Sequence, residues 1–134
     1  METILVDTSV WIDWFNQKDT PQTDVLARYI PDDRVLAITP TILQEVLQGI
    51  GDDRKFDAVK TALLSLTLLN LDPAEAATGA AELYRTGRRK GITIRKPNDC
   101  LIAYYPISCR VSLLHNDDDF EKIALFSELR IFRP

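Results

Sequence analysis

The sequence predicts an α/β fold in which helices cover both faces of a mostly parallel sheet. Short runs of β-branched and aliphatic residues alternate with segments of helical periodicity through nearly all of the 134 residues. This alternation is typical of parallel sheets, because two parallel strands need a crossover connection that is usually a helix. The first apolar run, residues 3–6, also lacks polar alternation, as expected for a strand buried on both faces.

The N-terminal part of the chain predicts two strands separated by two helices. Residues 3–6 end at Asp7, which is a favourable cap for the apolar helical stripe that follows. Pro21 suits the first turn of the second helix, because a first turn leaves its N–H groups unpaired and proline has none. We therefore expect a strand at 3–6, helices at 9–15 and 21–30, and a strand at 34–38.

The rest of the chain continues the same alternation. Thr39 and Pro40 mark a helix start, and Gly91 marks the end of a long alanine-rich helix. We expect helices from residue 40 and from residue 97, further helices at 54–65, 73–90 and 119–126, and strands at 67–71, 111–114 and 129–132. No internal repeat or low-complexity segment divides the chain, which predicts one domain over residues 1–134.

The composition is that of a soluble globular protein. Apolar residues make up 46% of the chain and charged residues 27%, and no apolar run approaches the roughly 18 residues that a membrane span needs. The N-terminus has no basic segment of the kind that begins a signal peptide. Cys100 and Cys109 match no zinc-binding spacing, so we interpret them as reduced thiols in a cytoplasmic protein with no membrane association.

The charged residues are unevenly distributed. The net charge of −4 by itself argues against nucleic acid as a partner, because phosphate groups are repelled by an acidic surface. However, six of the sixteen basic residues lie between residues 85 and 96. Acids gathered around a metal ion also present a less negative charge to a ligand than their formal count suggests. A nucleic-acid partner therefore stays open.

Four acidic residues are expected at one edge of the sheet. Asp7 ends the first strand, and Asp117 follows the strand at 111–114 by a few residues. Glu45 and Asp99 lie near the N-terminal ends of two helices. In open α/β sheets, ligands bind beyond the carboxyl ends of the strands, near the point where the strand order reverses.

Each of these acids also has a purely structural interpretation. Asp7 can cap the first helix, Asp99 can complement a helix dipole, and Glu45 can be a solvated helix residue. Asp117 begins a run of three aspartates that suits a charged turn. As a set, however, the four acids would repel one another unless they were paired, protonated or bound to a cation. Their carboxylate oxygens favour Mg²⁺ or Mn²⁺.

Four segments, in this order and at this spacing, resemble one known family. They are LVDTSVWIDWF at 5–15, TPTILQEVLQGI at 39–50, RRKGITIRKPNDCLIA at 88–103 and LLHNDDDFEKIA at 113–124. The chain resembles the PIN-domain ribonucleases, especially the VapC toxins of toxin–antitoxin pairs, over nearly its whole length. The resemblance implies a three-layer α/β/α PIN-like fold with a mostly parallel, five-stranded sheet of strand order 3-2-1-4-5.

The resemblance also implies an activity and the residues that carry it. It indicates an Mg²⁺-dependent ribonuclease, with Mn²⁺ as an alternative ion, which hydrolyses RNA phosphodiester bonds through four acids: Asp7, Glu45, Asp99 and Asp117. The expected metal ligands are Asp7, Asp99 and Asp117. Ser9 matches a hydroxyl near the metal, and Asp119 matches an acid that supports the ligands or caps the last helix. Asp118 is expected to face solvent.

The partners implied by the resemblance are RNA, a VapB-like antitoxin and a second copy of the chain in a homodimer. The candidate RNA-binding residues are Arg88, Arg89, Lys90, Arg95 and Lys96, although a solvated helix end explains part of this segment equally well. The candidate antitoxin contacts are Trp11, Trp14 and Phe15, whose helical spacing is equally typical of core residues.

One segment departs from the family, and two rival functions stay open. Residues 104–110 read YYPISCR where the family helix usually continues, and Pro106 is expected to kink or end that helix. The first rival is a phosphatase or phosphotransferase with an aspartyl nucleophile, but the second acid expected two residues after Asp7 is Ser9. The second rival is a catalytically impaired PIN-fold module that binds RNA or a partner without cutting.

Overall fold

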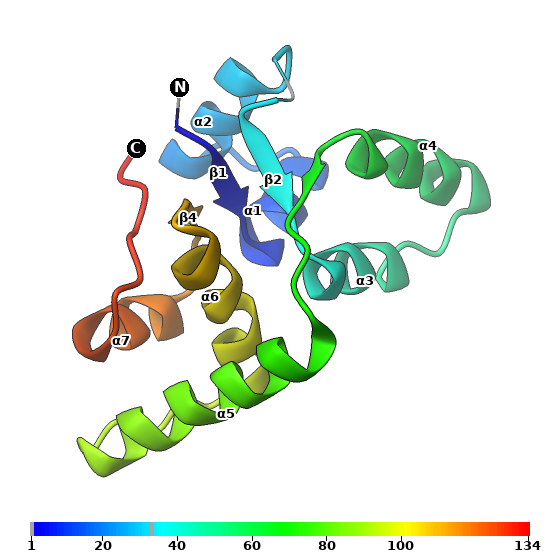
Figure 1. Cartoon of the computed structure of the whole chain (residues 1–134). Helices are drawn as coiled ribbons and strands as arrows, with labels where there is room; N and C mark the ends of the chain where they lie inside the picture. Colours follow the sequence, from blue (N-terminus) through cyan, green and yellow to red (C-terminus); the bar gives the residue numbers. More distant parts are fainter. Residues whose placement is uncertain (1, 33) are drawn as a thin grey trace.

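A four-stranded parallel sheet lies at the centre of the protein in the computed structural model, which describes residues 2–32 and 34–134. The strand order is β3-β2-β1-β4, and each neighbouring pair is parallel. The strands are β1 (Ile4–Val6), β2 (Leu36–Ile38), β3 (Thr67–Leu68) and β4 (Ser112–Leu114). The predicted α/β class and the order 3-2-1-4 are confirmed (Figure 1).

Three strands, β1, β2 and β4, are buried along their whole length, whereas the edge strand β3 is exposed. Every residue of β1, β2 and β4 is buried, as their continuous apolar sequences predict. Thr67 and Leu68 of β3 are exposed, and the ladder is shorter than the expected strand at 67–71. The N–H of Leu69 still donates to Ile38 O at 2.9 Å. Beyond this residue the chain leads to Asp72, which caps the next helix.

Seven helices surround the sheet within the described residues. They are α1 (Thr8–Phe15), α2 (Pro21–Tyr29), α3 (Pro40–Gln48), α4 (Asp53–Leu64), α5 (Pro73–Arg89), α6 (Pro97–Cys109) and α7 (Asp118–Phe126). Their starts follow the predicted capping chemistry: Thr39 Oγ1 accepts the N–H of Ile42 at 3.2 Å, and Thr20 forms a capping box with Thr23. Among the described helices, none combines the length and apolar character that crossing a bilayer requires.

The strand order places the helices on opposite faces. Right-handed crossovers from β1 to β2 and from β2 to β3 put α1 to α4 on one face. The crossover from β3 to β4 runs in the opposite direction across the sheet, so α5 and α6 cover the other face. The observed contacts agree, because α5, α6 and α7 pack against one another, and α1 packs against both α2 and α3 (Figure 1).

The fifth strand expected at 129–132 is reduced to one isolated parallel bridge. Leu113 pairs with Ile131 at the free edge of β4, the place that a fifth strand would take. The N–H of Leu113 donates to Arg130 O at 2.9 Å, and the N–H of Phe132 donates to Leu113 O at 2.8 Å. Alternate residues of a strand direct their backbone N–H and C=O groups to opposite neighbouring strands. Of the three residues of β4, only the middle one, Leu113, can therefore pair with residues at this free edge.

We expected Pro106 to kink or end its helix, and the prediction that the helix ends there is wrong. Helix α6 continues through Pro106 to Cys109. Pro106 cannot donate to the carbonyl of Ile102, but it lies in the last turn, where Arg110 adopts a left-handed conformation with φ 58°. The carbonyl of Pro106 then accepts the N–H groups of Arg110 and Val111, and its ring is buried. These contacts complete the helix end, so Asp99 stays on an intact first turn.

Candidate active site

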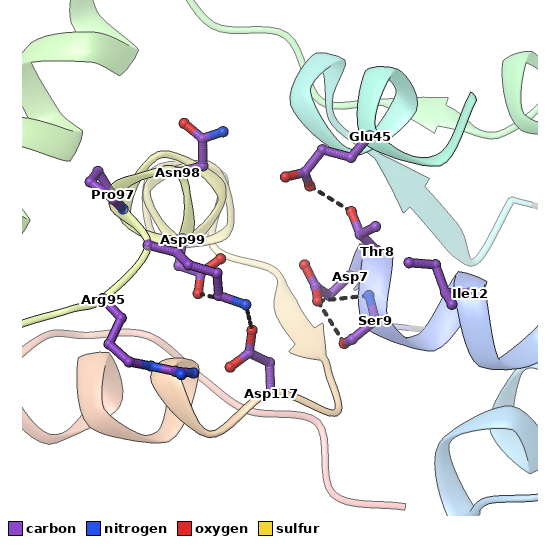
Figure 2. A pocket seen from close by; sticks show the side chains of 11 residues that line it. Asp7, Thr8, Ser9, Ile12, Glu45, Arg95, Pro97, Asn98, Asp99 and Asp117 are labelled. Carbon is purple, nitrogen blue, oxygen red and sulfur yellow. Dashed lines mark hydrogen bonds and ion pairs between the residues drawn. The ribbon is translucent and has the colours of Figure 1, made fainter. Parts of the chain in front are cut away.

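A cleft of about 540 Å³ opens at the carboxyl ends of β1 and β4, where the strand order reverses. Its lining includes all four acids that the sequence singled out: Asp7, Glu45, Asp99 and Asp117. Asp7 and Glu45 point into it from the α1 and α3 side, and Asp99 and Asp117 face them from the α6 and α7 side (Figure 2). The structure therefore brings together residues that are up to 110 positions apart.

Asp7 is held by the first turn of α1. It is the N-cap of that helix, and its Oδ2 accepts the N–H of Ser9 at 3.0 Å and the hydroxyl of Ser9 at 2.6 Å. Its own N–H donates to Leu114 O at 2.9 Å, which ties the end of β1 to the end of β4. Burial raises the pKa of Asp7 even though the hydrogen bonds from Ser9 favour the charged form.

Glu45 is positioned by a residue that the sequence reasoning missed. Thr8 Oγ1 donates to Glu45 Oε1 at 2.7 Å, and both side chains line the cleft. The sequence does show a second hydroxyl, that of Thr8, directly after Asp7 and beside Ser9. It does not show that this hydroxyl contacts Glu45 on α3, because 37 residues separate the two positions.

Asp99 and Asp117 share one ammonium group. Lys96 Nζ forms a hydrogen bond and ion pair with Asp117 Oδ2 and lies 3.7 Å from Asp99 Oδ2. Burial, together with repulsion by Asp117, raises the pKa of Asp99 to about 7 despite the charge of Lys96. Partial burial opposes ionisation of Asp117, but hydrogen bonds from Lys96 and the backbone of Asp119 outweigh it and lower the pKa of Asp117.

Asp119 is buried next to these two acids. Its side chain is fully buried, and neither carboxylate oxygen has a hydrogen-bond partner. Arg95 Nε lies 3.7 Å from Oδ2, and Lys122 Nζ lies 3.5 Å from Oδ1. One carboxylate oxygen from each of Asp99, Asp117 and Asp119 lies within 4.8 Å of the others. The helix cap in this segment is Asp117, which accepts the N–H of Asp119 at 3.0 Å, and Asp118 is exposed as predicted.

These carboxylates fit a hard divalent cation. The buried Oδ2 of Asp99 and both oxygens of Asp119 lack hydrogen-bond partners and have only ion pairs of 3.5 to 3.7 Å with basic side chains, so a cation bound directly to them would satisfy them more fully. All the candidate ligand atoms are carboxylate oxygens, which suit Mg²⁺ and Mn²⁺.

The five basic residues predicted to bind RNA fall into two groups. Arg95 and Lys96 line the cleft and contact its acids. Arg88, Arg89 and Lys90 are exposed at the C-terminal end of α5 and do not line the cleft. The structure therefore gives the first two a direct relation to the acidic site and leaves the other three on the outer surface.

A second positioning network, which the sequence did not reveal, reaches Asp117 from the C-terminal tail. Arg133 makes two hydrogen bonds of 2.8 Å to Glu121, whose Oε2 lies 2.7 Å from His115 Nε2. His115 Nδ1 accepts the N–H of Asp117 at 3.0 Å, so the proton resides on Nε2. His115 thus holds the turn that carries Asp117.

Comparison with known proteins identifies the family. The PIN domain family model matches residues 4–125. The chain belongs to the PIN domain family. The curated relatives of this PIN domain include VapC ribonuclease Mb1587 of Mycobacterium bovis, which is 34% identical over 128 residues, covering 95% of this chain and 96% of that protein. Ribonuclease VapC11 of Mycobacterium tuberculosis has the same identity and coverage, so the predicted relation to the VapC group is confirmed.

Solved structures share the PIN fold with this chain at lower sequence identity. The DNA-bound VapBC structure from Salmonella typhimurium has a TM-score of 0.76 and 22% identity, and the match covers 98% of both chains. VapBC2 from Rickettsia felis, bound to a promoter DNA fragment, has a TM-score of 0.74 and 18% identity over 97% of both chains. These matches show that the shared fold extends over nearly the full chain.

Proposed function

We propose that this PIN domain is the toxin of a toxin–antitoxin pair and hydrolyses RNA phosphodiester bonds with Mg²⁺ or Mn²⁺. The observation that carries the proposal is the convergence of four acids from distant segments on one cleft: Asp7, Glu45, Asp99 and Asp117. The names of its VapC relatives support the ribonuclease activity. Because both cysteines are free, we assign the activity to the reducing cytoplasm.

In this proposal Asp7, Asp99 and Asp117 would hold the cation, and Asp119 lies next to Asp99 and Asp117. When bound, the cation polarises the scissile phosphate and lowers the pKa of the attacking water. Glu45, whose Oε1 accepts a hydrogen bond from the Thr8 hydroxyl, would be the base that takes a proton from the attacking water. Ser9 fixes Asp7, so the chain supplies a preorganised set of carboxylates and needs no histidine in contact with substrate.

The basic residues outline a path for the RNA backbone. A second hollow of about 370 Å³ shares Pro97 and Asn98 with the cleft and extends to Tyr84 and Arg85 on α5. Beyond it, the guanidinium of Arg88 lies 5.6 Å from the centre of the Tyr84 ring. We propose that phosphates follow this line from the basic end of α5 to the cleft, because basic side chains bind the backbone without regard to sequence.

The proposal is tested by incubating antitoxin-free protein with a mixed RNA pool and Mg²⁺ or Mn²⁺. Asp99→Asn removes a buried carboxylate of the cleft, and Asp118→Asn is the matched control on an exposed aspartate. We expect cleavage by the unchanged protein and by Asp118→Asn, and none by Asp99→Asn or in the presence of a chelator.

Two results would contradict the proposed reaction. Cleavage that persists in Asp99→Asn would mean that the acids are wrongly assigned or that a contaminant cuts the RNA. If the folded protein binds Mn²⁺ but cuts no RNA in the pool, a PIN-fold module that binds without cutting becomes the better description.

We further propose that a VapB-like antitoxin binds beside α1. A groove of about 250 Å³ there is lined mainly by apolar side chains, including Trp11, Trp14, Phe15 and Ile30. The rings of Trp11 and Phe15 stack with their centres 6.0 Å apart. A peptide segment with apolar side chains would cover this groove.

A homodimer is the remaining part of the proposal. Its support is the resemblance to the VapC toxins rather than a particular surface of this chain. Size-exclusion chromatography with light scattering on the antitoxin-free protein would give twice the monomer mass, and a monomer at all concentrations would contradict it.

A further inference from the structure

Lys96 stands at a position where lysine is locally unfavourable. It is the N-cap of α6, and its carbonyl accepts the N–H of Asp99 at 2.9 Å, but its side chain makes no capping hydrogen bond. N-caps favour short side chains with an oxygen, and a positive charge is disfavoured beside the positive end of a helix dipole. Such local conflicts are expected at functional sites, where another requirement decides the residue.

The ammonium group of Lys96 lies between two carboxylates of the cleft. Nζ contacts Asp117 Oδ2 and is 3.7 Å from Asp99 Oδ2, which has no hydrogen-bond partner. Lysine has an ordinary pKa of about 10.4, so this group is positively charged at neutral pH. Lys96 is therefore the counter-ion of this carboxylate pair.

The other basic residues near the acids do not have this position. Arg95 and Lys122 both contact Asp119, at 3.7 and 3.5 Å, on its two different carboxylate oxygens. Only Lys96, among the described residues, has ion pairs with both Asp99 and Asp117. Its side chain is 55% exposed, so packing does not lock it in place and it is able to swing away.

We propose that Lys96 is a built-in competitor of the divalent cation, whose ammonium group neutralises Asp99 and Asp117 and leaves before both can bind a metal. The inference rests on the proposed metal site and adds a restraint on its occupancy. The ammonium faces one oxygen of each of two carboxylates that would hold the cation, and two positive ions at such short range repel each other strongly. The intrinsic affinity of the acids for metal is thereby reduced.

The test measures metal binding directly, without RNA. Manganese is titrated into the protein at fixed pH and salt, and electron paramagnetic resonance of the unbound aqueous Mn²⁺ gives the dissociation constant. Lys96→Met removes the charge and keeps most of the apolar side chain, whereas Lys96→Arg keeps the charge. Lys55→Met is the matched control, because it removes one exposed positive charge from α4, which contributes no residue to the cleft.

We expect Lys96→Met to bind Mn²⁺ about three- to tenfold more tightly than the unchanged protein, as removal of one competing ion pair predicts. For Lys96→Arg and Lys55→Met, we expect Mn²⁺ dissociation constants within about twofold of that of the unchanged protein. Adding Asp99→Asn to Lys96→Met should abolish the gain, which locates the effect at this carboxylate pair.

Equal or weaker Mn²⁺ binding by Lys96→Met would overturn the inference while leaving the metal site intact. An equal gain in Lys55→Met would also overturn it, because the effect would then reflect total charge. If neither the unchanged protein nor Lys96→Met binds Mn²⁺ while both remain folded in thermal unfolding, the proposed metal site itself is wrong.

Discussion

The hydroxyl of Ser9 accepts the backbone N–H of Asn116 at 2.9 Å, across 107 residues of sequence. The same hydroxyl donates to Asp7 Oδ2 at 2.6 Å. One side chain therefore links the end of β1 to the turn after β4, and sets the position of Asp7 relative to the segment that carries Asp117. The two sides of the crevice are joined by this contact as well as by the sheet.

Replacing Ser9 by alanine is expected to reduce RNA cleavage by about ten- to hundredfold, the usual cost of losing a group that orients a metal ligand. Stability should fall by only about 1 kcal/mol, because one hydrogen-bonded hydroxyl is lost. Ser65→Ala is a suitable control, since that hydroxyl caps the distant end of α4 by donating to Ala62 O at 2.6 Å. Equal activity of the two variants would show that Ser9 does not position the site.

Asp119→Asn tests whether this buried acid belongs to the metal site. Its oxygens lie near those of Asp99 and Asp117, so the loss of its charge should weaken Mn²⁺ binding about tenfold or more. Asp118→Asn changes the neighbouring exposed aspartate in the same way and should leave the Mn²⁺ dissociation constant unchanged. A titration in which both variants match the unchanged protein would assign Asp119 to helix packing and ion pairing alone.

The stability of the metal-free protein is expected to depend on pH through Asp99. Its pKa is raised to about 7, whereas an unfolded aspartate has a pKa of about 3.9. The native state therefore binds more protons than the unfolded state in this window, so the free energy of unfolding should fall as pH rises from about 4 to about 7. Asp99→Asn should remove this contribution.

Urea unfolding with a chelator, at several pH values, measures the difference between the two proteins. The stability of the unchanged protein relative to Asp99→Asn should decline across the window and level off above it. A difference that is constant with pH would mean that Asp99 titrates normally.

Arg133→Ala is expected to loosen the C-terminal tail in a pH-dependent way. Hydrogen bonds from Arg133 lower the pKa of Glu121, so their stabilising effect is present above the unfolded pKa of glutamate and is lost as pH falls through the lower native value. Because the side chains of Arg133 and Glu121 are both partly exposed, the free energy of unfolding at neutral pH should fall by about 0.5 kcal/mol in the variant. Hydrogen exchange of the Asp117 amide, with exposed Arg54→Ala as control, would detect the looser His115 contact.

A charge at the rim of the α1 groove should weaken antitoxin binding. Ile30 is 37% exposed and lines this groove, so Ile30→Glu places a carboxylate beside Trp14 and Phe15 with little effect on the core. Leu125→Glu makes the same kind of change at a more exposed position on α7, outside the groove. In co-purification with the cognate antitoxin, we expect loss of complex only for Ile30→Glu; loss for both or neither would place the antitoxin elsewhere.

Much of the fold could be predicted from local sequence. The apolar run before Asp7 and the cap at Thr39 specify their elements through burial and hydrogen bonding within a few residues. Prediction failed for the lengths of two elements. The strand expected at 129–132 became one bridge because its distant partner β4 offers it only Leu113. Helix α6 passes Pro106 because the left-handed conformation of Arg110 closes its last turn.

Local sequence specified which residue types are available for the site, and the family resemblance indicated which acids belong to it. The partners of these side chains depend on the folded chain: Thr8 donates to Glu45, Ser9 accepts from Asn116, and Lys96 lies between Asp99 and Asp117. Hydrogen bonds and ion pairs act over a few ångströms of space, so the separation of two residues along the chain does not limit them. Local periodicity specifies where each element begins. The reversal of strand order between β1 and β4 specifies which side chains meet at the cleft.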